Sequence, residues 1–166
     1  MAQLIDLPEY LLQEETEELN ISHKGLISLT GIEKFRNLKK LYCSNNQITS
    51  LNSLPSGLQV LNCSDNQITY LNSLPSGLQE FYCSHNQITS LDFLPSGLQI
   101  LYCSDNPLSQ RYIDKTLTEI KDINNKRNLQ AKKVYKIWKR YWYEQKDKNG
   151  ENRYIKSLRG KNSLIL

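Results

Sequence analysis

Apolar and polar residues alternate over short stretches of this chain, and these stretches recur every twenty residues. Leu41 and Cys43 alternate with Tyr42 and Ser44, and the same pattern returns at 61–64, 81–84 and 101–104. A period of two sends successive side chains to opposite faces of a β-strand. The pattern therefore predicts one short strand in each repeat, with the Leu41 and Cys43 positions pointing inward.

A second group of apolar residues follows each strand. In the first full repeat, Ile48, Leu51 and Leu54 return the chain, and the turn Pro55-Ser56-Gly57 leads into the next strand. Glycine is free to take a positive φ in such a turn, so we expect one at Gly57. A unit of this length cannot bury its apolar side alone, so the units must stack as the coils of a solenoid.

An imperfect fifth coil precedes the four regular ones. Leu19, Ile21, Leu26 and Leu29 match the regular apolar positions at a spacing of twenty-two residues, but Lys24 stands where the other coils carry asparagine. An amide at that bend can donate to and accept from the backbone of adjacent coils, so these asparagines should form a ladder: Asn46, Asn66, Asn86 and Asn106. The predicted strands are Leu19 to Ile21, Leu41 to Cys43, Leu61 to Cys63, Phe81 to Cys83 and Leu101 to Cys103.

The repeated pattern L-x-x-L-x-C-x-x-N-x-I-x-x-L-x-x-L-P-x-x resembles the leucine-rich repeat family over roughly residues 16–108. The resemblance implies an α/β-type solenoid, in which parallel strands line a concave sheet. The convex side should be irregular, because the L-P-S-G return leaves too few residues for a helix. The repeat length and the L-P-S-G turn are similar to those of bacterial secreted effectors and large-virus proteins.

Both ends of the stack are expected to carry helical caps. Asp6, Pro8 and Glu9 are typical of a helix start within an N-terminal cap at 1–18. The repeats occupy 19–108, as about five coils, and a helical cap with a basic tail occupies 109–166. Within this last region Ile113, Leu117 and Ile120 predict a helix over 110–123 that covers the last coil.

A second C-terminal helix is predicted over 126–143. At 100° per residue its apolar side chains fill one arc and its basic ones the opposite arc: Lys132, Lys133, Lys136, Lys139 and Arg140. We expect Val134, Ile137, Trp138 and Tyr141 to be buried, on the repeats or on a partner, because a monomer rarely exposes such a patch. The basic face suits a nucleic acid, a membrane surface or a calmodulin-like partner. The segment 129–142 also resembles an IQ motif.

Charge is divided unevenly along the chain. Residues 1–110 hold five Lys/Arg and eleven Asp/Glu, whereas residues 111–166 hold sixteen and six. The asymmetry indicates an acidic repeat surface and a basic tail. No segment reaches the ~20 apolar residues of a membrane span, and the first residues lack the features of a secretory signal. We therefore expect a cytoplasmic protein, in the host cytoplasm if it is viral or an effector.

Metal, cofactor and catalytic chemistry find little support in the sequence. The four cysteines, Cys43, Cys63, Cys83 and Cys103, fall one per coil. Stacked strands place them in a row at ~4.8 Å intervals, which cannot form the tetrahedron that zinc requires. The two histidines, His23 and His85, occupy the same outward-facing position in non-adjacent coils, and buried cysteines are inert. We expect buried, reduced cysteines, no metal, no cofactor and no enzymatic activity.

Outward positions differ from coil to coil, whereas the inward positions barely change. Three rows result, each with one residue per regular coil, and their tyrosines are flanked by polar groups that differ between coils. Tyrosine offers large contact area at low entropic cost, which favours protein binding. We therefore expect a protein-interaction module whose concave face binds a protein through Lys40, Tyr42, Asn62, Asp65, Glu80, Tyr82, His85, Tyr102 and Asp105. The alternative is binding of nucleic acid or another acidic surface by the basic helix and tail.

Overall fold

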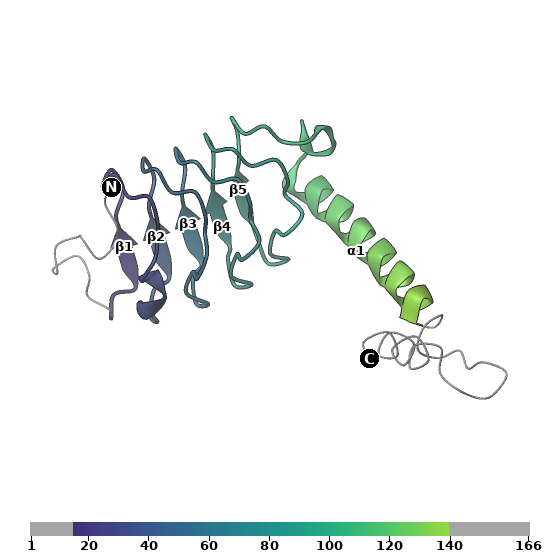
Figure 1. The fold of residues 1–166 in the computed structure, drawn as a ribbon, viewed down its shortest axis with the longest axis horizontal. Helices are drawn as coiled ribbons and strands as arrows, with labels where there is room; N and C mark the ends of the chain where they lie inside the picture. Colours follow the sequence, from purple (N-terminus) through teal and green to yellow (C-terminus); the bar gives the residue numbers. More distant parts are fainter. Residues whose placement is uncertain (1–14, 140–166) are drawn as a thin grey trace, which may run out of the picture. The chain divides into compact units, whose positions relative to one another are not determined.

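Five short parallel strands form a single sheet, one strand per coil. The computed structural model describes residues 15–139. The strands lie side by side in chain order (Figure 1), and each hydrogen-bonds to its neighbours along the sequence. Their bounds are β1 Glu18–Asn20, β2 Lys40–Tyr42, β3 Val60–Asn62, β4 Glu80–Tyr82 and β5 Ile100–Tyr102. The predicted parallel solenoid is confirmed.

Equivalent residues of successive coils lie in register. Leu19 pairs with Leu41, which pairs with Leu61, and the same line continues through Phe81 to Leu101. The first four of these side chains are at most 4% exposed. Because the coils repeat their apolar positions, the register places equivalent apolar side chains of neighbouring coils against one another and builds one continuous core.

Each strand begins and ends one residue earlier than predicted. Backbone pairing nevertheless continues past the assigned ends, since the Cys43 N–H donates to the Asn62 carbonyl at 2.8 Å. The predicted and observed strand bounds therefore differ by one residue only in how the strand ends are assigned. The return segments of the first three regular coils, at 47–57, 67–77 and 87–97, contain no helix. The first coil is two residues longer than the regular coils, and it contains one 3-10 turn, η3 (Ile32–Lys34).

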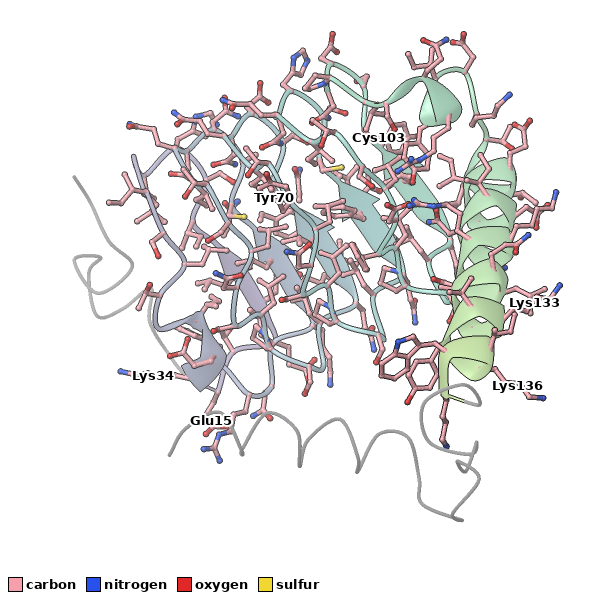
Figure 2. The ribbon with its side chains drawn as sticks, turned by 45° about the vertical axis from the view of Figure 1, so that its right-hand side comes forward. Glu15, Lys34, Tyr70, Cys103, Lys133 and Lys136 are labelled. Atoms are coloured by element: carbon pink, nitrogen blue, oxygen red, sulfur yellow. The ribbon has the colours of Figure 1, made fainter. Side chains whose placement is uncertain are left out.

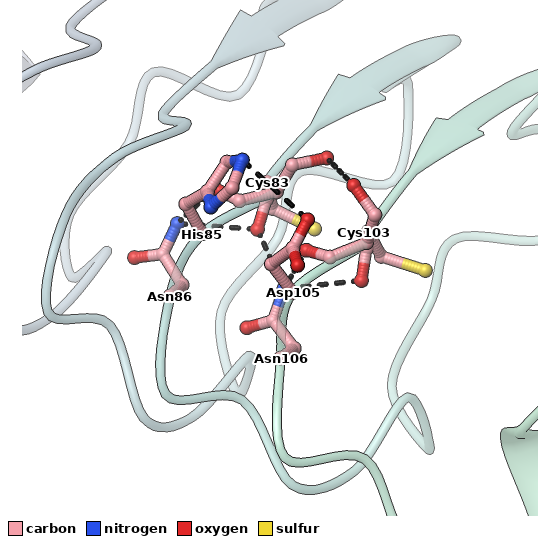
Figure 3. A network of polar contacts seen from close by, with 8 residues as sticks. Cys83, His85, Asn86, Cys103, Asp105 and Asn106 are labelled. Carbon is pink, nitrogen blue, oxygen red and sulfur yellow. Dashed lines mark hydrogen bonds and ion pairs between the residues drawn. The ribbon is translucent and has the colours of Figure 1, made fainter.

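An asparagine ladder runs along the stack as predicted. Asn66 illustrates one step: its Oδ1 accepts the Ile48 N–H at 2.9 Å, and its Nδ2 donates to the carbonyls of Cys43 and Cys63, both at 3.0 Å. Asn86 repeats the pattern one coil later. Figure 3 shows the Asn86 and Asn106 steps beside Cys83 and Cys103. Each amide thereby pairs buried backbone groups of two consecutive coils.

In the regular coils, the glycine of the L-P-S-G turn is not left-handed. Gly57 does not adopt a positive φ, and a Cβ there would meet its nearest heavy atom, the Leu38 carbonyl oxygen, at 3.8 Å. Our expectation for Gly57 is therefore wrong. The left-handed conformation instead falls just after each strand, where the coils carry residues that tolerate it, with φ between 53° and 58°: His23, Asn45, Asp65, His85 and Asp105.

The C-terminal side of the stack is capped differently from the prediction. After the 3-10 turn η4 (Gln110–Tyr112), Asp114 takes a positive φ and stops any helix there. Helix α1 (Leu117–Lys139) begins only after Thr116, which with Glu119 forms a capping box: the Thr116 N–H donates to Glu119 Oε2 at 2.8 Å. One helix, α1, therefore stands where two helices were predicted, over 110–123 and 126–143. Residues 140–143 of the second predicted helix lie outside the described residues.

Different residues from those predicted cover the last coil. Ile113 is 42% exposed, whereas Tyr112 and Ile120 are each 2% exposed. The Tyr112 hydroxyl donates to Asp92, and the Lys121 ammonium donates to the carbonyl of Ser96 at 3.0 Å. The cap thus combines a buried aromatic ring with a lysine bonded to backbone oxygens.

The chain divides into two compact units, with the boundary inside α1 after Asp122. The predicted N-terminal cap at 1–18, with its short helix, falls almost entirely on residues outside the described range, and β1 begins at its last residue, Glu18. Within the described residues, no helix combines the length and the apolar character needed to cross a membrane.

Candidate protein-binding surface

The outward residues of the strands assemble into two parallel rows. The first row is Lys40, Val60, Glu80 and Ile100, and the second is Tyr42, Asn62, Tyr82 and Tyr102; in both rows each residue pairs in register with the next. We call these eight residues, together with the turn row Asn45, Asp65, His85 and Asp105, the strand face. Sequence positions twenty residues apart are therefore neighbours in space, and every predicted surface residue belongs to this face.

Two tyrosines stack on the strand face. The rings of Tyr82 and Tyr102 stack with centroids 5.3 Å apart and planes 6° from parallel. Tyr102 is 60% exposed, whereas Tyr82 is half-buried beneath its neighbours. The Tyr82 hydroxyl donates to Glu80 Oε2 at 2.9 Å, and this bond to a carboxylate raises the pKa of Tyr82. The stack offers a flat aromatic surface with one tyrosine held in place.

The first coil extends the strand face beyond the predicted residues. Glu18 pairs with Lys40 in register, and its carboxylate lies 3.3 Å from the Lys40 ammonium. The hydrogen bond to Glu18 raises the pKa of Lys40. Our sequence analysis omitted Glu18, although the spacing of twenty-two already aligned its coil with the next.

The turn row holds its side chains on strained backbone. Asn45, Asp65, His85 and Asp105 are exposed, and each N–H of the first three donates to a serine carbonyl of the following coil at 2.9 to 3.0 Å. His85 Nε2 lies 3.4 Å from Asp105 Oδ2 (Figure 3), an ion pair when the imidazole is protonated. The row therefore presents small polar and acidic groups at one end of the strands.

The cysteine row lies beneath this surface. Cys43, Cys63 and Cys83 are fully buried, Cys103 is half-buried, and all four are free thiols. Burial raises the pKa of Cys43 to about 12 and those of Cys63 and Cys83 well above their usual range. No group of metal-ligating side chains gathers among the described residues. Protonated, buried thiols act as small apolar residues of the core.

The basic helix is only partly where the sequence analysis placed it. Lys132, Lys133, Lys136 and Lys139 are all exposed on α1, and Figure 2 shows Lys133 and Lys136 projecting from the same side of the helix. Arg140 and Tyr141 lie outside the described residues. Val134, Ile137 and Trp138 are 64%, 70% and 46% exposed, so they are not buried within the described chain, and their burial on a partner stays a prediction.

Two exposed aromatic residues escaped the sequence analysis. Tyr70 and Phe93 lie on the return segments and are 69% and 63% exposed. Tyr70 lines a shallow hollow of about 220 Å³ together with Thr49 and Asn72. The signal was present, because Tyr70 and Phe93 replace serines of the other coils, but we compared only the strand positions.

Comparison with known proteins supports the repeat architecture. Models of the family described as Leucine Rich repeats (2 copies) match residues 17–56, 56–96 and 76–130, which together make up more than half of the chain. No curated protein matches the chain. The match to the family models therefore covers the repeats and the first part of α1.

Two solved structures of bacterial proteins are similar to parts of the chain. YopM from Yersinia enterocolitica WA-314 shares 35% identity with a TM-score of 0.47, over 50% of this chain and 18% of YopM. A Shigella effector LRR domain shares 25% identity with a TM-score of 0.42, over 59% of this chain and 53% of that domain. The chain thus spans less than two thirds of either protein. On its repeat pattern, its stacked coils and its family match, the chain belongs to the leucine-rich repeat family.

Proposed function

We propose that this protein is a non-catalytic interaction module that binds a protein partner on its strand face. Leucine-rich repeat proteins are typically non-catalytic and take part in protein–protein interactions. The observation that carries the proposal is the Tyr82–Tyr102 stack, 5.3 Å between centroids, on an exposed sheet surface. Stacked, pre-ordered tyrosines lose little entropy on binding, and tyrosine is enriched among the residues that dominate interface energetics.

Charge around the stack indicates the character of the partner. Glu18, Glu80, Asp65 and Asp105 lie on or beside the strand face, and Lys40 is already paired with Glu18. The surface is therefore mainly acidic around an aromatic centre. A partner with an apolar anchor for the tyrosines and a basic rim fits this pattern, because complementary charge speeds and orients association.

Affinity capture with variants of the full chain tests the proposal. Tyr42, Tyr82 and Tyr102 are replaced together by serine, and the matched control replaces the exposed aromatics of the return side, Tyr70 and Phe93, by serine. Loss of at least tenfold in partner binding from the first variant only, with unchanged melting temperature, is the expected result. Equal capture by both variants would remove the strand face from the proposal.

A second interpretation rests on the lysines of α1, which are exposed and suit an acidic partner such as a nucleic acid or a calmodulin-like protein. Salt separates the two interpretations, because phosphate contacts make affinity fall steeply with ionic strength. Binding through the tyrosines depends on salt only weakly. A chain truncated after residue 125, which retains the cap residues Tyr112 and Ile120, should keep strand-face binding and lose binding through the helix.

A further inference from the structure

The second half of α1, residues 126–139, is exposed on every side. Its apolar members include Val134 at 64%, Tyr135 at 61%, Ile137 at 70% and Trp138 at 46% exposed. The rings of Tyr135 and Trp138 stack with centroids 6.2 Å apart, so the two form one aromatic plate. A monomer rarely leaves such a contiguous apolar patch in water, and a patch of this kind marks an interaction site.

The exposed apolar residues lie on the same side of the helix as Ile120, which α1 buries in its first turn. At 3.6 residues per turn, Ile120 and Trp138 lie on the same line along the helix, about five turns apart. Ile120 is 2% exposed, whereas Trp138, Val134 and Tyr135 around the same line are open to solvent. Asn124 and Arg127 lie beside the same line between them, so this side of the helix has two separate apolar parts, of which the first is buried and the second, from Ala131 onward, is exposed.

Charge restricts what can cover this apolar side. From Ile123 to Tyr143 the sequence holds seven Lys/Arg and no Asp/Glu. Four of the lysines, at 132, 133, 136 and 139, are exposed on the side opposite Trp138. A second copy of the helix would bring like charges together, which disfavours self-pairing. An anionic partner is attracted instead.

Among anionic partners, a bilayer surface satisfies both sides of the helix together, as an acidic protein with an apolar groove also would. A nucleic acid held by the lysines would leave Ile137 and Trp138 in water. At a bilayer, the apolar side enters the boundary between headgroups and acyl chains, while lysine side chains extend to the lipid phosphates. The composition agrees, because tryptophan and tyrosine favour that boundary and a leucine-rich seam typical of helix pairing is absent from 130–139.

We propose that residues 126–139 of α1 bind the surface of an anionic membrane, with the helix axis in the plane of the bilayer. Val134, Tyr135, Ile137 and Trp138 enter the interface, and Lys132, Lys133, Lys136 and Lys139 contact anionic headgroups. The strand face belongs to the other compact unit of the chain, so separate variants test the two binding activities.

Intrinsic fluorescence of the full chain provides the test. Of the only two tryptophans, Trp138 belongs to this segment and Trp142 follows it by three residues in the sequence, so the emission reports on this part of the chain and not on the repeats. We expect vesicles of phosphatidylcholine with phosphatidylserine to shift the emission to the blue and to carry the protein upward in flotation. Vesicles of phosphatidylcholine alone should do much less, because anionic lipid supplies the attraction to lysine.

Two variants separate the contributions of charge and burial. Replacing Lys132 and Lys136 by glutamine should weaken partitioning roughly 25-fold, since each lysine near an anionic surface contributes about fivefold. The matched control, Lys24→Gln with Lys34→Gln, makes the same charge change on the repeats and should leave binding unchanged. Ile137→Ser should weaken it by about tenfold or more with both tryptophans retained.

Three results would overturn the proposal. An emission that is already blue in buffer and insensitive to vesicles would mean that the chain itself covers the apolar side. Binding to a DNA duplex without binding to anionic vesicles would assign the lysines to nucleic acid. Equal binding of the glutamine variant at 132 and 136 and its matched control would show that the helix does not provide the anionic contact.

Discussion

Asn66→Ala removes one step of the asparagine ladder from the middle of the stack. The Asn66 side chain accepts the Ile48 N–H at 2.9 Å and donates to the carbonyls of Cys43 and Cys63 at 3.0 Å. Those two carbonyls also accept from Asn46 and Asn86, at 2.9 and 3.0 Å, so each keeps one donor in the variant. The Ile48 N–H loses its acceptor, and it is the group that the substitution leaves unpaired.

One buried, unpaired N–H sets the expected magnitude. Leaving a buried donor unsatisfied costs about 1–3 kcal/mol. We expect Asn66→Ala to lower the free energy of unfolding by that amount. Asn86→Ala should match it, because it leaves the Ile68 N–H in the same position. Asn106→Ala should cost less, since Asn106 is half-exposed and water can reach the groups that it pairs.

Urea unfolding followed by far-ultraviolet circular dichroism measures this loss. A change of about 2 kcal/mol lowers the midpoint by roughly 1 M at a typical slope. Gln67→Ala is the matched control, because Gln67 is the exposed neighbour whose own N–H donates to the Ile48 carbonyl through the backbone alone. We expect it to change stability by less than about 0.5 kcal/mol. If Asn66→Ala and Gln67→Ala behaved alike, the ladder would not stabilise the stack.

The remaining predictions concern buried polar groups. In the native protein, half-buried Cys103 should react with a thiol reagent first, and denaturant should then expose four free thiols in total. Burial raises the pKa of Cys43 to about 12, so the thiol of the unfolded chain ionises at a lower pH than the thiol of the folded chain. The free energy of unfolding should therefore stay constant below pH ~8.5 and fall as the pH rises toward about 12, by about 1.4 kcal/mol per pH unit for this group. Thermal melts of the wild type and Cys43→Val across that range should show a shallower decline in the variant. The Ser109 hydroxyl is buried without a hydrogen-bond partner within the described range, so Ser109→Ala should leave the melting temperature unchanged or raise it; a clear decrease would reveal a partner.

The repeat made most of the fold predictable. Positions such as Leu41, Leu61 and Phe81 change little between coils, and identical spacing forces them into register once the coils stack. The asparagine ladder followed from the same repetition, because an amide at a fixed bend must meet the backbone of its neighbour. The surface rows were predictable for the same reason.

Errors arose where backbone conformation or the ends of the repeat decide the structure. The positive φ at Asp65 and its equivalents could have been predicted, since aspartate, asparagine and histidine tolerate that region, but glycine in the L-P-S-G turn drew the prediction instead. At the C-terminal end, the apolar period favoured Ile113, whereas the positive φ of Asp114 ends the turn and Tyr112 is buried. The capping box at Thr116 and Glu119 marks the true helix start.

The ladder has a direction along the chain. The Oδ1 of Asn46, Asn66, Asn86 and Asn106 in each case accepts backbone N–H groups from the coil before it. The last coil needs no asparagine from a following coil, because Pro107 has no N–H and the Leu108 N–H donates to the Asn106 carbonyl at 2.7 Å. During synthesis on the ribosome, a coil therefore gains its full set of backbone bonds only when the next coil has emerged. The folding front should trail the exit tunnel by one coil, and a chain released early should end on a coil whose buried N–H has no acceptor.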